Sequence, residues 1–220
     1  MKVTDLISRY TDENLSYVYD DLVTIITISV LFFILSIPVF TIGSSMIAAH
    51  KVINDVHDGR RISEMGRMKV MIRTFSQNLL RGLPISILLL LLFFMELMYI
   101  QITLVTGSST FLVLSVVGLY IIILTLPALI RSSNIMSQSG SSTFIGSVLH
   151  SLLTITSDKK GYVKHVGKMS LIVAICSLIP ILGVILLPGI LSVMEVKSYE
   201  TVVTNRDVAS PKKSMTQHEI

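Results

Sequence analysis

Residues 32–61 have the sequence FFILSIPVFTIGSSMIAAHKVINDVHDGRR, and they hold a pattern that the rest of the chain repeats. An apolar run that begins at Leu22 ends at Pro38, which lacks a backbone N–H and disfavours helix in the residue before it. Gly43 can take the left-handed conformation that closes a helix, and the serines after it can cap the next one. The sequence therefore predicts a membrane span, a corner, and then an amphipathic helix lying on the membrane surface.

The composition is that of a membrane protein. Hydrophobic residues make up 51% of the 220 residues and charged residues only 15%. Soluble domains carry about 25% charged residues. The single cysteine, Cys176, lies in an apolar run and excludes an intrachain disulfide, so we expect a reduced, packed thiol. The expected fold class is an all-α polytopic membrane protein with amphipathic cytoplasmic helices.

The apolar stretches predict four or five transmembrane helices in a single membrane domain, residues 1–205. Three spans are expected near residues 20–40, 83–105 and 109–131. The stretch near residues 160–200 fits either one tilted span or a hairpin broken at Pro180. The hairpin, and hence five spans, is favoured because it keeps the basic tail on the cytoplasmic side. The polar tail, residues 206–220, is expected to be disordered.

The basic residues predict how the chain is oriented. They gather in the two long connections between spans, whereas the hairpin tip Thr106–Ser108 has none. By the positive-inside rule, both connections are cytoplasmic and the N-terminus is outside. The expected location is the cytoplasmic membrane. A basic surface here indicates anionic lipid headgroups as the partner, and there is no nucleic-acid motif.

Prolines recur at the ends of apolar runs and suggest an internal repeat. Pro127 ends the third apolar stretch as Pro38 ends the first, and Pro188 follows Leu187 in the last one. From Pro38 to Leu83 is 45 residues, and from Pro127 to Leu171 is 44. This spacing predicts two same-direction repeats with helix joints at Pro38, Pro127 and Pro188. The alternative is that the prolines coincide by chance.

Two cytoplasmic segments have helical amphipathicity. The first follows the basic turn at residues 59–66 and carries an apolar stripe up to Leu79. The second, Thr143–Thr156, has apolar side chains on one side and polar ones on the other. Its apolar side consists of Phe144, Val148, Leu152 and Ile155, and its polar side of Ser147, His150, Ser151 and Thr154.

The corner Pro38-Val-Phe-Thr41-Ile-Gly43 matches a P-x-x-T-x-G pattern, and through it the chain resembles the YesL-like DUF624 family of prokaryotic membrane proteins. The segment Phe75–Asn78 before the second span adds to the resemblance. The chain departs from the family at Ser29 and Phe32, where Asn and Trp are usual. The family has no established reaction, and its members often accompany carbohydrate ABC transporters. The resemblance therefore implies an accessory role near sugar uptake.

Glu96 is the one acidic residue inside a clear span. It lies eleven residues before Gly107, or about 16 Å below the hairpin tip. An ionisable group at that depth costs at least about 2.5 kcal/mol unless it is paired or neutral. Folding the chain at Gly107 brings Gly118 opposite Glu96, and we expect Tyr120 to donate a hydrogen bond. Glu96 is either a neutral structural acid or a group that titrates during transport.

Histidines supply the other candidates. His50, Asn54 and His57 share one helical face, but metal sites on one helix usually pair ligands four residues apart, and here that partner is an asparagine. We therefore predict no metal and a solvated polar face. His150 and His165 are expected to be interfacial side chains. No nucleophile elbow or phosphate-binding loop occurs, so neither an enzyme nor a cofactor is predicted.

The sequence thus favours a non-catalytic accessory or scaffold protein of the cytoplasmic membrane. Its expected partners are the lipid bilayer and either a carbohydrate ABC transporter or a second copy of the chain. The rival hypothesis is a small secondary carrier or channel that uses Glu96. An enzyme of the lipid interface is a more distant alternative.

Overall fold

The computed structural model describes residues 22–58, 63–139, 143–178 and 180–209. All regular structure in these ranges is helical, which confirms the predicted all-helical fold. The elements are α2 (Leu22–Leu35), the 3₁₀ turn η1 (Val39–Thr41), α3 (Ile42–His57), α4 (Glu64–Gln77), α5 (Leu79–Thr106), α6 (Ser109–Gln138), α7 (Phe144–Ser157), α8 (Lys159–Leu178) and α9 (Pro180–Ala209).

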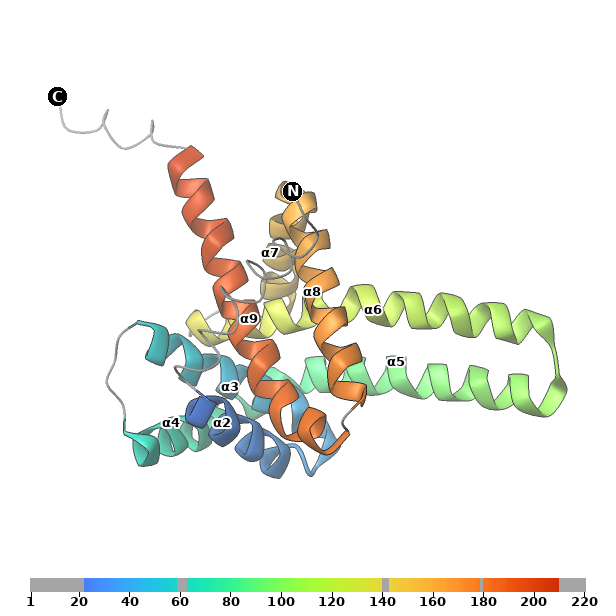
Figure 1. Cartoon of the computed structure of the whole chain (residues 1–220), viewed down its shortest axis with the longest axis horizontal. Coiled ribbons are helices and arrows are strands. Elements are labelled where there is room, and N and C mark those ends of the chain that lie inside the picture. The colour runs from blue at the N-terminus through green and yellow to red at the C-terminus, as the bar shows by residue number, and fades with distance from the viewer. Residues whose placement is uncertain (1–21, 59–62, 140–142, 179, 210–220) are drawn as a thin grey trace.

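Helices α5 and α6 form a long hairpin that extends away from the other helices (Figure 1). Gly107 joins them with a left-handed φ of 63°, a conformation that glycine adopts without steric strain. Within the described ranges, these two helices are long and apolar enough to cross a membrane. Helices α2 and α7 are apolar but have 14 residues each, about 21 Å of helix, which is less than the thickness of a bilayer core.

Helix α3 lies at the centre of the body from which the hairpin extends. It packs against α2, α4, α5, α6 and α9, and its residues 43–55 are all buried except Lys51. The prediction of a helix on the membrane surface is therefore wrong. Its first two turns consist mainly of glycine, serine and alanine, and such small side chains let neighbouring helices approach closely.

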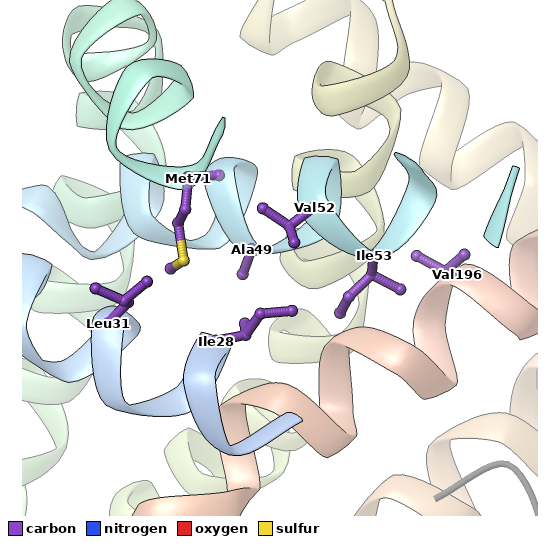
Figure 2. Close-up of a cluster of buried hydrophobic side chains, with 8 residues drawn as sticks. Ile28, Leu31, Ala49, Val52, Ile53, Met71 and Val196 are labelled. Carbon is purple, nitrogen blue, oxygen red and sulfur yellow. The ribbon is translucent and has the colours of Figure 1, made fainter. Parts of the chain in front are cut away.

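The apolar core of the body forms around α3 (Figure 2). Side chains from α2, α4 and α9 meet one side of that helix, as Figure 2 shows. The labelled members are Ile28, Leu31, Ala49, Val52, Ile53, Met71 and Val196. Of the apolar stripe predicted for α4, Met71 is fully buried against this core and Phe75 is half-buried, whereas Met68 and Ile72 are exposed. Much of the hairpin lies outside this core.

The corner at Pro38 exists, but Gly43 does not have the predicted role in it. Helix α2 stops at Leu35, and the Thr41 hydroxyl lies 2.5 Å from the Leu35 carbonyl oxygen and 2.6 Å from that of Pro38, so it holds the turn. Gly43 lies inside α3, and of the described residues only Gly107 has a positive φ. A Cβ on Gly43 would lie 2.1 Å from the Gly82 carbonyl oxygen. Gly43 is thus needed for the close contact of α3 with α5.

The predicted joints at Pro127 and Pro188 are wrong, because both prolines lie inside helices. An interior proline removes one backbone hydrogen bond, and a helix survives when its neighbours compensate. Three residues after Pro127 stands Ile130, which has no hydroxyl to repeat the Thr41 contact, and α6 continues to Gln138. Beside Pro188, the Gly189 N–H donates to the Ser29 hydroxyl of α2 at 2.9 Å. The two proline-bounded repeats are therefore absent from the fold.

The last apolar stretch forms two helices. Helix α8 ends at Leu178 and α9 begins with Pro180, a residue that suits the first turn of a helix. The two helices pack against each other. Residues 206–209 of the predicted tail belong to α9, and residues 210–220 lie outside the described ranges.

Candidate functional site

A charged cluster lies where α6, α8 and α9 meet. Glu195 of α9 is 0% exposed and Arg131 of α6 is 2% exposed. Arg131 Nε donates to Glu195 Oε1 at 2.7 Å, and His165 Nε2 of α8 lies 2.7 Å from Glu195 Oε2. Both oxygens of one buried carboxylate are therefore held by two other helices. We call Arg131, His165 and Glu195 the junction cluster.

Two further contacts fix the guanidinium of the junction cluster. Arg131 Nη2 donates to the Ser198 hydroxyl at 3.2 Å, one turn along α9 from Glu195. The guanidinium carbon lies 5.6 Å from the centre of the Tyr162 ring, within the range of a cation–π interaction. The Tyr162 hydroxyl donates in turn to the Leu124 carbonyl oxygen at 3.1 Å. Arg131 thus links α6 to both α8 and α9.

The environment of Glu195 keeps it ionised. Burial raises the pKa of this carboxyl, but the hydrogen bond from His165 and the positive charge of Arg131 outweigh it, so the pKa lies below its usual value. A carboxylate and a guanidinium in contact compensate each other's charge. Removing one of them would leave the other buried and unpaired, which is costly. The cluster is well suited to hold three helices in a fixed arrangement.

A second set of polar contacts joins α3 to the end of α6. His50 Nδ1 lies 2.8 Å from the Met46 carbonyl oxygen and 3.0 Å from the Ser133 hydroxyl. Asn54 Nδ2 donates to Asn134 Oδ1 at 3.0 Å and to the Ser137 hydroxyl at 2.9 Å. The predicted solvated face is therefore wrong for His50 and Asn54, which are buried, since the polar end of α6 supplies their partners.

The remaining histidines lie in different surroundings. His57 is at the exposed end of α3, with Nδ1 2.9 Å from Glu200 Oε1. His150 is exposed, and its ring centre is 6.4 Å from that of Tyr199. His165 is buried in the junction cluster, so its prediction as an interfacial side chain is wrong. Within the described ranges, no group of three His, Cys, Asp or Glu residues could hold a metal ion.

Burial lowers the pKa of His50 to about 4, although the charge of Glu195 and the Met46 carbonyl act in the opposite direction. The imidazole is therefore neutral near pH 7. Because the Met46 carbonyl oxygen can only accept, Nδ1 carries the proton. Nε2 is then an acceptor, which is buried and has no hydrogen-bond partner in the part of the chain that the structure describes.

The lowered pKa of His50 predicts a pH-dependent stability. The unfolded chain binds a proton near pH 6.5 and the folded chain only near pH 4, so protonation favours unfolding between these values. The contribution of neutral His50 to the free energy of unfolding is complete above about pH 6.5, and about 1.4 kcal/mol is lost for each pH unit between there and about pH 4. Circular dichroism melts of His50→Gln and wild type in detergent should show a shallower acid decline in the variant. Parallel declines would contradict the assignment.

Glu96 lies inside the hairpin, between α5 and α6. It is 8% exposed, and the Ser115 hydroxyl donates to its Oε1 at 2.6 Å. Gly118 is opposite, where a Cβ would lie 2.4 Å from Glu96 Oε2. The donor predicted from the sequence is wrong, because Ser115 makes this bond and Tyr120 is 63% exposed. Glu96 Oε2 is buried and has no hydrogen-bond partner among the described residues.

Sequence reasoning missed the junction cluster, although a signal was present. Arg131 and Glu195 each follow directly on a long apolar run, and they carry opposite charges. The positive-inside rule treats Arg131 as one of the basic residues of the second long connection, and that interpretation hides its pairing with Glu195. Opposite charges at the ends of two apolar runs indicate helices that come together there.

Comparison with known proteins gives no relative: no family model, curated protein or solved structure matches the chain. The resemblance to the YesL-like family stays a prediction from the corner motif.

Proposed function

We propose that this chain is an integral membrane protein whose α5–α6 hairpin crosses the bilayer. The observation that carries the proposal is the surface of the hairpin, where large apolar side chains point outward. Phe93 and Phe94 of α5 are 62% and 65% exposed, and Val116 of α6 is 61% exposed. Moving one such side chain fully out of water lowers the free energy by about 1.5–3 kcal/mol. A bilayer provides that environment along the apolar part of the hairpin that extends beyond the body.

The orientation follows from the basic residues. We place the tip at Gly107 outside the cytoplasmic membrane, and the body with its basic connections and junction cluster on the cytoplasmic side. The hairpin is the spanning unit in this proposal. Further spans by α2, α8 and α9, which would complete five, are less favoured because α8 and α9 run across the direction of the hairpin (Figure 1).

The proposed role is that of a non-catalytic accessory or scaffold component. Arg131, His165 and Glu195 pair with each other in the junction cluster, and such a set of buried contacts is suited to fixing helices. The resemblance to the YesL-like family suggests a carbohydrate ABC transporter as the partner. Self-association is the second possibility for the exposed faces. Co-purification of the full chain from native membranes tests these partners.

The rival function is a small carrier in which Glu96 exchanges a proton. It is favoured by the unpartnered Oε2 of Glu96, because ionisable groups within spans often belong to transport paths. The hydrogen bond from Ser115 and the contact with Gly118 favour a structural role instead.

Glu96→Gln separates the two roles. Glutamine is nearly isosteric and can accept the Ser115 bond but cannot release a proton. With a structural role, the variant should keep wild-type assembly and uptake, while Glu96→Leu should weaken the hairpin packing by roughly 0.5–2 kcal/mol. The measurements are thermal melts in detergent and uptake in a deletion strain. A Gln variant that folds normally but has lost uptake would establish the carrier.

A further inference from the structure

On helix α7, two serines and Thr154 face the body and a stripe of four large apolar side chains faces outward, while Phe144 is half-buried and His150 is exposed. Ser147 and Ser151 are fully buried against the body, whereas Ile145 is 77% exposed and Leu149 57%. Leu152 and Leu153 extend the exposed stripe, and the four apolar residues lie on the side of the helix opposite to the buried serines. A helix at a water-facing surface has the reverse pattern.

Helix α7 lies where the proposed membrane-crossing part of α6 ends. The Ser151 hydroxyl donates to the Ala128 carbonyl oxygen at 3.2 Å, which ties α7 to α6 where its apolar stretch ends before Arg131. Figure 1 shows α7 running across the direction of the hairpin, near its base. If the hairpin crosses the bilayer, α7 therefore lies along the membrane plane at the cytoplasmic interface.

The charge beside the stripe fits an anionic surface. Lys159 and Lys160 are exposed at the start of α8, directly after α7. The nearest acidic side chain in sequence, Asp158, accepts the Gly161 N–H at 2.9 Å and caps α8. An interfacial helix binds through its apolar face, and lysines beside that face are attracted to an anionic leaflet.

We propose that α7 is an interfacial anchor that binds anionic lipid. Its stripe of Ile145, Leu149, Leu152 and Leu153 inserts among the upper acyl chains, and Lys159 and Lys160 contact the headgroup phosphates. The inference rests on the proposed crossing of the hairpin. Its consequence is that α7, rather than the hairpin alone, sets how deep the body lies in the cytoplasmic leaflet.

The test places a fluorescent probe on single cysteines in the full chain, reconstituted in vesicles with and without phosphatidylglycerol. Replacing Cys176 by serine gives a cysteine-free background. The probe is attached at Leu149→Cys on α7, at Phe94→Cys in the hairpin as a deep reference, and at Thr201→Cys on α9 as an aqueous reference. Quenching is compared for aqueous iodide and for nitroxide lipids labelled near the headgroup or deep in the chain.

We expect the shallow nitroxide to quench the Leu149 probe more than the deep one, and the reverse order at Phe94. Phosphatidylglycerol should increase the Leu149 quenching, and Lys159→Gln with Lys160→Gln should abolish that increase. The matched control, Lys69→Gln with Arg73→Gln on α4, removes the same charge elsewhere and should leave the increase unchanged.

Iodide quenching at Leu149 as strong as at Thr201, with Phe94 still deep, would overturn the anchor and assign the stripe to a protein partner. Equal quenching of the Leu149 probe in vesicles with and without phosphatidylglycerol would overturn the assignment to anionic lipid. Iodide quenching at Phe94 would instead refute the crossing of the hairpin. It would also refute the anchor, because that inference rests on the crossing.

Discussion

Replacing Arg131 by methionine is expected to lower the free energy of unfolding by about 3–5 kcal/mol, the usual cost of breaking a buried ion pair. Methionine fills part of the same volume but leaves Glu195 buried with His165 as its remaining partner. The packing of α6 against both α8 and α9 should weaken, because Arg131 contacts side chains of both helices. Unfolding followed by circular dichroism in a mild detergent measures the loss.

A double variant separates the ion pair from general packing. Arg131→Met combined with Glu195→Leu removes both charges, and an apolar replacement of a whole buried pair is often neutral. We expect the double variant to recover much of the stability lost in Arg131→Met. A double variant that is less stable than either single variant would show that the two charges do not depend on each other.

Gly43→Val is expected to destabilise the chain by about 3 kcal/mol, the upper end for overpacking. The reason is the contact between α3 and α5, where the Gly82 carbonyl oxygen occupies the position of the new side chain. This atom belongs to a helix backbone and cannot move aside as a flexible side chain can. The two helices must separate, which also breaks the bond from the Gly43 N–H to the Ser86 hydroxyl.

The matched control is Gly167→Val on α8, where nothing lies within 4 Å of the added Cβ. Valine is slightly more favourable than glycine in a helix, so this variant should be within about 0.5 kcal/mol of wild type. Thermal melts of both variants provide the comparison. Equal stability of Gly43→Val and Gly167→Val would rule out the close α3–α5 contact.

Long apolar runs made the hairpin predictable. Two mostly apolar stretches, each more than twenty residues long, lie on either side of Gly107 and can hardly form anything other than paired helices, and that pairing also brought Gly118 to Glu96. The hydrogen-bond donor was not predictable in the same way. Ser115 and Tyr120 both lie near Gly118 in sequence, and the rotation of α6 about its axis decides which of them faces Glu96.

The centre of the body was harder to predict, for a physical reason. Sequence periodicity detects a helix face by its large apolar residues. The buried faces of α3 instead consist of glycine, serine and alanine on one side and of His50 and Asn54 on another. Polar residues are buried when a neighbour supplies partners, and the partners of α3 lie about 80 residues away on α6. The prolines failed as markers because Pro38 is followed by Thr41, which closes a turn, and Pro127 is not.

The most direct test of the central claim, that the hairpin crosses the membrane with the body on the cytoplasmic side, is cysteine labelling in intact cells. Single cysteines replace Ser108 at the tip and the exposed Gln77 of α4, in a chain with Cys176→Ser. A membrane-impermeant maleimide should label the Ser108→Cys chain in intact cells and the Gln77→Cys chain only after lysis. Equal labelling of the two chains before lysis, or of neither until lysis, would show that the hairpin does not cross.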